Sequence, residues 1–341
     1  SVAIGRSALN AQNFSTNTNT YNVAVGAAAG TAVTTGVENT LIGGLAGDAL
    51  TDADFNVALG SRALGADTLG SRSIAIGRST LGTQNFTTAT DAYNVAVGYE
   101  AGVAVTTGIR NVIVGGLAGD ALTDADYNVA MGYASLSTDT LGSRSTAIGF
   151  GALENQNFTT ATDVYNVAVG FSAGNNATTG VQNVLIGGKA GDALTTGDGV
   201  VAVGFEALMT EDGNGNSVAV GRQALRTQNA GAEAYNVAVG NGAGYNVTTG
   251  IKNTLIGSLA GDAMTDSDRN VAVGYGALSS DTLGSRSTAI GDGALTTQNF
   301  TTATSSYNVA VGHSAGESVT TGERNTLIGS LAGDAMTVAP N

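Results

Sequence analysis

The chain contains no cysteine and no tryptophan among its 341 residues, and only one proline and one histidine. Without cysteine there can be no disulfide bond and no thiolate site. The lone proline, Pro340, leaves almost every backbone N–H free to donate, as a stacked β-ladder requires. His313 is the only imidazole, so the chain has no Ser-His-Asp set, and we expect no enzymatic activity.

Positive charge is also scarce, because 13 Lys and Arg stand against 27 Asp and Glu for a net charge of −14. Nucleic acid is therefore a poor partner. No apolar run reaches membrane-spanning length, so we expect no membrane insertion. The 51 glycines do not recur every third residue, which excludes collagen. Apolar residues make up 42% of the chain at fixed positions, which argues against disorder.

What the chain does have is a five-residue phrase that occurs nineteen times, first as Ser1-Val2-Ala3-Ile4-Gly5 and next as Asn22-Val23-Ala24-Val25-Gly26. Copies start 17, 17, 17 and then 21 residues apart, which gives a super-repeat of 72 residues, one of them two residues short. A short strand plus turns at a fixed period predicts a parallel β-solenoid (β-roll) of about nineteen coils. We expect one elongated unit over residues 1–341, with super-repeats 22–93, 94–165, 166–235 and 236–307 and partial ones at 1–21 and 308–341.

The second and fourth positions of the phrase are apolar or threonine, and a period of two places them on one face of a strand. We expect them to form the core columns of the solenoid. The columns include Val23, Val25, Val95, Val97, Val167, Val169, Val237, Val239, Val309 and Val311.

The third position points to the opposite face and is alanine in fourteen coils and Leu or Ile in five. An exposed apolar stripe is unusual in a soluble monomer, so we expect this column to be a subunit interface, with a trimer favoured. The alternative is that it faces the second sheet of its own coil. The column includes Ala24, Leu41, Ala96, Ile113, Ala168, Leu185, Leu255 and Leu327.

The ends of the phrase carry their own signals. The first position is Asn in thirteen coils, and stacked amides can hydrogen-bond from layer to layer. The fifth position is Gly in all nineteen, as expected where the chain turns tightly or a neighbouring backbone approaches.

Acidic clusters after one phrase in each super-repeat are the candidate metal ligands. Hard oxygen ligands suit Ca²⁺, so a calcium site stays open beside the alternative of a solvated acidic corner. No other cofactor is expected. The candidates are Asp48, Asp52 and Asp54, then Asp120, Asp124 and Asp126, and finally Asp262, Asp266 and Asp268. A separate spacing of five, as in Asp67 and Arg72, predicts an ion pair at a corner of the coil.

The longest coil of each super-repeat holds most of the aromatic residues, in candidate surface loops with Phe14, Phe86, Phe158 and Phe300. Two interpretations remain open. The rings either form ledges on which sugars stack, or pack over the coil edge or against a neighbouring subunit.

The phrase followed by Ala-Leu or Ala-Gly resembles two repeat families. One is the head repeat of trimeric autotransporter adhesins, and the other is the β-solenoid repeat of bacteriophage tail fibres, which the Thr34-Thr35-Gly36 and Asn39-Thr40-Leu41-Ile42-Gly43 segments resemble more closely. The resemblance implies an extracellular fibre shaft for host attachment, on a virion or a cell surface. It also implies a homo-oligomer with a cell-surface glycan or protein as its receptor. A bacterial surface adhesin or self-assembling filament is the alternative, and a calcium-dependent β-roll binding module is a further one.

Overall fold

The computed structural model describes residues 1–338, and over that range the chain is an all-β parallel solenoid of about nineteen turns without a helix. Each phrase contributes one strand of three residues. Contacts divide the chain into two compact units, Ser1–Val167 and Ala168–Asn341. The expected solenoid fold is therefore confirmed, whereas the single shaft over 1–341 stays a prediction.

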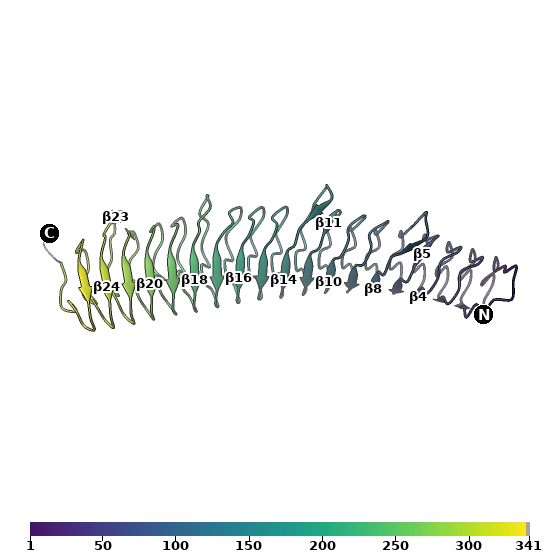
Figure 1. Ribbon diagram of the computed structural model, residues 1–341, viewed down its shortest axis with the longest axis horizontal. Coiled ribbons are helices and arrows are strands. Elements are labelled where there is room, and N and C mark those ends of the chain that lie inside the picture. The colour runs from purple at the N-terminus through teal and green to yellow at the C-terminus, as the bar shows by residue number, and fades with distance from the viewer. Residues whose placement is uncertain (339–341) are drawn as a thin grey trace. The chain divides into compact units, whose positions relative to one another are not determined.

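In the first unit the phrase strands pair in parallel, each with the next phrase and with every position opposite the same position, as in Ala96 opposite Ile113. The arrows of β4, β8 and β10 lie in one row in Figure 1, and β5 and β11 lie at the other edge of the coils. The phrase strands are β1 (Val2–Ile4), β2 (Val23–Val25), β3 (Thr40–Ile42), β4 (Val57–Leu59), β6 (Ile74–Ile76), β8 (Val95–Val97), β9 (Val112–Val114), β10 (Val129–Met131) and β12 (Thr146–Ile148). The two-residue side strands pair as β5 (Gly70–Ser71) with β7 (Thr90–Asp91), and β11 (Gly142–Ser143) with β13 (Thr162–Asp163).

The second unit repeats the same arrangement, and β14 (Val167–Val169) spans the boundary between the units. Its phrase strands are β15 (Val184–Ile186), β16 (Val201–Val203), β17 (Val218–Val220), β18 (Val237–Val239), β19 (Thr254–Ile256), β20 (Val271–Val273), β22 (Thr288–Ile290), β24 (Val309–Val311) and β25 (Thr326–Ile328). One side pair joins β21 (Gly284–Ser285) to β23 (Thr304–Ser305).

The glycine that ends each phrase is required twice over. Gly98 has φ +141°, a conformation that residues with a Cβ rarely adopt. A Cβ placed there would also lie 2.4 Å from the carbonyl oxygen of Gly115 in the next coil. Larger residues are therefore excluded by both backbone conformation and stacking distance.

The interior of each coil is narrow and is filled mainly by alanine. Ala24, Ala58 and Ala75 at the third position of the phrase are fully buried, as are Ala29 and Ala46 three residues after the phrase. Where the third position is Leu41, small residues make room for it, because a Cβ on Gly47 would lie 2.8 Å from its Cδ2 atom. The next coil has Ala58 at the third position and instead carries the buried Leu64 where the Leu41 coil has Gly47.

The asparagine column forms the expected ladder between layers. The Asn22 Oδ1 atom accepts the backbone N–H of Asn39 at 2.9 Å, and the Asn39 Oδ1 atom accepts that of Asn56 at 3.0 Å. The Asn39 amide also donates to the carbonyl oxygen of Ala53 across the coil at 2.7 Å. Each buried asparagine side chain therefore bonds both to the opposite side of its own coil and to the backbone of the next coil.

Candidate functional site

The outer face of the phrase strands is formed by the second and fourth positions, so the expected core columns are wrong. Val23, Val25, Val95 and Val97 are half-exposed, and Val239 is 37% exposed. Val167, Val169, Val237, Val309 and Val311 are likewise not buried. Period-two alternation separates two faces of a strand, but it does not say which of them points inward. The narrow interior takes alanine in most coils, and glycine makes room where the inward residue is larger, as Gly47 does for Leu41.

The expected interface column is wrong for the same reason. Ala24, Leu41, Ala96, Ile113, Ala168, Leu185 and Leu255 are all 0% exposed inside the coils, and Leu327 in the last strand is half-buried. These side chains face the far wall of their own coil, which was the alternative interpretation.

The outer face is therefore the apolar surface of this chain. Its two columns contain no charged residue in any of the nineteen phrases, only Val, Ile, Leu, Met and Thr. A three-residue strand is about 10 Å long and strands stack about 4.8 Å apart, so each phrase offers about 48 Å². Summed over both units, the outer face amounts to about 900 Å². The nine phrase strands that lie wholly in the first unit offer about 430 Å² by themselves, and monomers rarely expose contiguous apolar patches larger than a few hundred Å².

A corner column borders the outer face, made of the residue directly before each phrase. In the first unit it alternates aromatic and basic residues over seven coils: Phe55, Arg72, Tyr93, Arg110, Tyr127, Arg144 and Tyr165. The Arg72 guanidinium carbon lies 4.6 Å from the centre of the Phe55 ring and 5.9 Å from that of Tyr93. The Arg144 guanidinium lies 4.9 Å from the centre of the Tyr127 ring. Contacts of this kind stabilise by about 0.5–1 kcal/mol each at exposed sites.

The arginines of the corner column form ion pairs that differ from the expected ones. Arg72 bonds Asp91 at 2.9 Å and Arg144 bonds Asp163 at 3.0 Å, so neither pairs with the aspartate five residues before it. Sequence reasoning missed this column. Its signal was the strict alternation of ring and guanidinium directly before successive phrases.

The candidate surface loops hold their phenylalanines inside. Phe86, Phe158 and Phe300 are only 5–7% exposed, and Phe14 is half-buried. The Phe86 N–H donates to the Oδ1 atom of buried Asp67 at 3.1 Å. Gln84 donates to the other carboxylate oxygen of Asp67 at 2.5 Å. The sugar-ledge interpretation therefore fails for these rings, which close the interior of the longest coils.

Several carboxylates of the acidic clusters already accept hydrogen bonds from the neighbouring coil. The Asp52 Oδ1 atom accepts the Thr35 hydroxyl at 2.6 Å, and the Asp54 Oδ1 atom accepts the N–H of Val37 at 2.8 Å. Asp124, Asp126, Asp266 and Asp268 repeat these contacts. Among residues 1–338, no three His, Cys, Asp or Glu side chains gather in a way that could hold a metal ion.

The first aspartate of each acidic cluster differs from the other two in its pKa and in its hydrogen bonding. Burial raises the pKa of Asp48, Asp120 and Asp262. Within the described part of the chain, the Oδ1 atoms of Asp120 and Asp262 are buried without a hydrogen-bond partner. Each is a lone carboxylate rather than part of a ligand set.

No protein-family model matches the chain, and no curated protein matches it. No helix within residues 1–338 is long and apolar enough to cross a membrane.

Proposed function

We propose that the chain is a structural and adhesive fibre subunit whose copies associate through the outer faces of their phrase strands. The observation that carries this proposal is the uncharged apolar outer face, continued through all nineteen phrases. Stable interfaces bury about 800 Å² on each partner, and the outer faces of the two units sum to about 900 Å² in each copy, to be shared among the copies that it contacts.

A second copy of this chain is the occupant that fits best. Any copy carries the same columns at the same spacing, so side chains can interdigitate coil after coil in one register. Two narrow columns on each chain favour three copies around a common axis, because each chain then contacts both neighbours. The acidic remainder of the surface keeps other contacts weak, since like charges repel.

The biological role follows from this assembly and from the resemblance of the repeat. The role we favour is the shaft of a phage tail fibre that holds a receptor-binding end away from the particle, in an extracellular setting. A bacterial surface adhesin or filament would use the same construction. The mechanism is mechanical and multivalent, since several copies acting together strengthen weak contacts with a glycan or protein receptor. It requires no catalysis.

Single cysteines test the proposal, because the natural chain has none. Val97 to Cys places one thiol on the outer face, and we expect it to form a disulfide between copies when a mild oxidant is added. Ala89 to Cys is the matched control, since Ala89 is exposed directly before the side strand β7 and lies outside the phrase strands. Equal cross-linking of the two variants, or none at residue 97, would contradict association through the outer face.

A further inference from the structure

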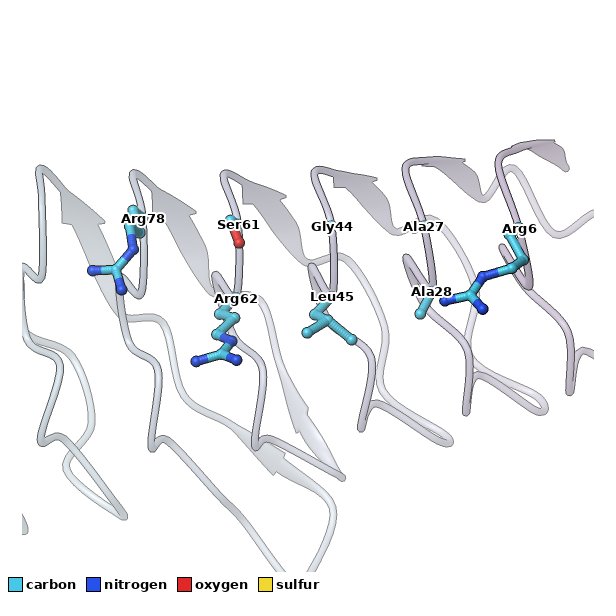
Figure 2. Close-up of a pocket in the computed structure, with 8 residues that line it drawn as sticks. All are labelled: Arg6, Ala27, Ala28, Gly44, Leu45, Ser61, Arg62 and Arg78. Atoms are coloured by element: carbon cyan, nitrogen blue, oxygen red, sulfur yellow. The ribbon is translucent and has the colours of Figure 1, made fainter.

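A groove in the first unit lies beside the outer face, along the two residues that follow each of the first five phrases. Its volume is about 480 Å³. Ala27, Ala28 and Gly44 form a floor of small residues, and Arg6 lies at one end with Arg62 and Arg78 at the other. Figure 2 shows the Arg6 side chain extending beside Ala28, with Leu45 between it and Arg62.

Within residues 1–338, one of the three guanidinium groups has hydrogen-bond and ion-pair partners and the other two do not. Arg78 bonds Glu100 at 2.9 Å and the hydroxyl of Tyr99 at 3.1 Å. In the part of the chain that the structure describes, the side chains of Arg6 and Arg62 form neither a hydrogen bond nor an ion pair. Arg62 interacts electrostatically with Asp48 without forming an ion pair with it. A chain with net charge −14 and only 13 basic residues thus leaves two of them unpaired along one groove.

Backbone groups of successive coils bond to one another along the groove. The N–H of Ala28 donates to the carbonyl of Arg6 at 2.8 Å, and the N–H of Arg62 donates to that of Gly44 at 3.1 Å. The N–H of Leu45 likewise donates to Ala27 at 3.0 Å. The attraction for an anionic ligand therefore comes from the guanidinium groups, and the small residues leave room for the ligand to lie along the groove.

The next super-repeat closes the same place with aromatic rings. Tyr99 stands where the first has Ala27, Tyr133 replaces Ser61, and Phe150 replaces Arg78. The Tyr133 and Phe150 rings stack with their centres 5.5 Å apart. Arg62 becomes Ala134. The second repeat therefore carries rings where the groove has Ala27, Ser61 and Arg78, and it lacks the charge of Arg62.

We propose that this groove binds an acidic polysaccharide, with carboxylate or sulfate groups on Arg6 and Arg62 and sugar rings over the alanine floor. Arginine matches both oxyanions with paired N–H donors. The two arginines are three coils apart, about 14 Å along the stack, so the ligand is an extended chain rather than a single ion. The inference rests on the proposed attachment function only for its biological setting. It specifies the class of glycan to which such a protein would attach.

The test measures binding of oligogalacturonate, dextran sulfate and neutral dextran to the full chain by calorimetry. We expect one or both acidic glycans to bind and neutral dextran not to bind, with the stronger acidic ligand identifying the oxyanion. Arg62 to Ala and Arg6 to Ala should each weaken binding by about tenfold or more. Ala27 to Tyr should block it, and the second repeat already carries tyrosine at that place. Arg222 to Ala, which removes a charge at the coil position of Arg6 in the second unit, should leave binding unchanged.

Absence of binding, equal binding of neutral dextran, or binding that survives Arg6 to Ala, Arg62 to Ala and Ala27 to Tyr would overturn the proposal. Equal binding of polyglutamate would overturn the assignment to a glycan and point to an acidic peptide. Circular dichroism checks that each variant is folded. The mass of the Arg62 to Ala variant in solution separates this inference from the fibre proposal, because loss of the glycan site should leave association through the outer face intact.

Discussion

Leu41 and Gly47 compete for one volume inside the third coil: a Cβ on Gly47 would lie 2.8 Å from the Cδ2 atom of Leu41. Gly47 also has φ +54°, which disfavours alanine. The glycine and the leucine six residues earlier therefore depend on each other.

Replacing Gly47 with Ala should destabilise the chain by about 1–3 kcal/mol, through overpacking and backbone strain. Leu41 to Ala alone should cost about 2–5 kcal/mol by opening a cavity. The double variant should be more stable than the sum of the two losses predicts, because alanine at 41 removes the close contact with Leu41, whereas the one with the Leu50 Cδ1 atom at 2.8 Å remains. Thermal unfolding of all three, with Gly44 to Ala as a control at an uncrowded glycine, measures this coupling; strict additivity would show that the two residues are independent.

Asn39 to Ala should be among the most damaging single changes on the ladder. It leaves the Asn56 N–H and the Ala53 carbonyl without their partners, and unsatisfied buried groups cost about 1–3 kcal/mol each. We expect a clear fall in melting temperature. Asn10 to Ala, at an exposed asparagine, should change it little. Similar melting temperatures for the two variants would mean that the amide ladder contributes nothing.

Mild acidification should stabilise the fold, and only stronger acidification should destabilise it. Burial raises the pKa of Asp67, Asp139 and Asp281, against the hydrogen bonds from Gln84, Gln156 and Gln298. A carboxyl whose pKa is raised by folding contributes stability below its ordinary value near 4, and loses it as the pH rises through the raised native value. The melting temperature should therefore be higher at about pH 4 than at about pH 7. A steady fall on acidification would contradict the assignment, and Asp67 to Asn should reduce the pH dependence.

Chelation gives a separate test of the calcium alternative. Because Asp52 and Asp54 already accept hydrogen bonds from Thr35 and Val37, the corner does not need an ion to hold its carboxylates in place. Excess EDTA should leave the melting temperature unchanged. A drop that added Ca²⁺ reverses would instead establish a calcium-dependent fold.

The repeat period predicted the solenoid, the glycine corners and the asparagine ladder, because each depends on spacing along the chain alone. Which strand face points inward depends on the width of the coil, which spacing does not give. One signal for the inward face was available in the sequence. The third coil has Leu41 and Gly47, whereas the fourth coil has Ala58 and Leu64 at the same two positions, as expected of residues that share a volume. Whether Phe86 packs or forms a sugar ledge stayed open from the sequence, because its partner Asp67 lies nineteen residues earlier, in the neighbouring coil. The groove between Arg6 and Arg62 could not be predicted from the sequence, because it depends on which coils stack side by side.

Light scattering of the wild-type chain and of Val97 to Asp tests the central claim most directly. The wild type should have a multiple of the 33.5 kDa chain mass, with three copies favoured, and the variant should have a lower mass with unchanged circular dichroism. Ala96 to Glu, one residue away but fully buried, should instead lose the strand signal. A monomeric wild type, or a Val97 to Asp variant of unchanged mass, would contradict association through the outer face.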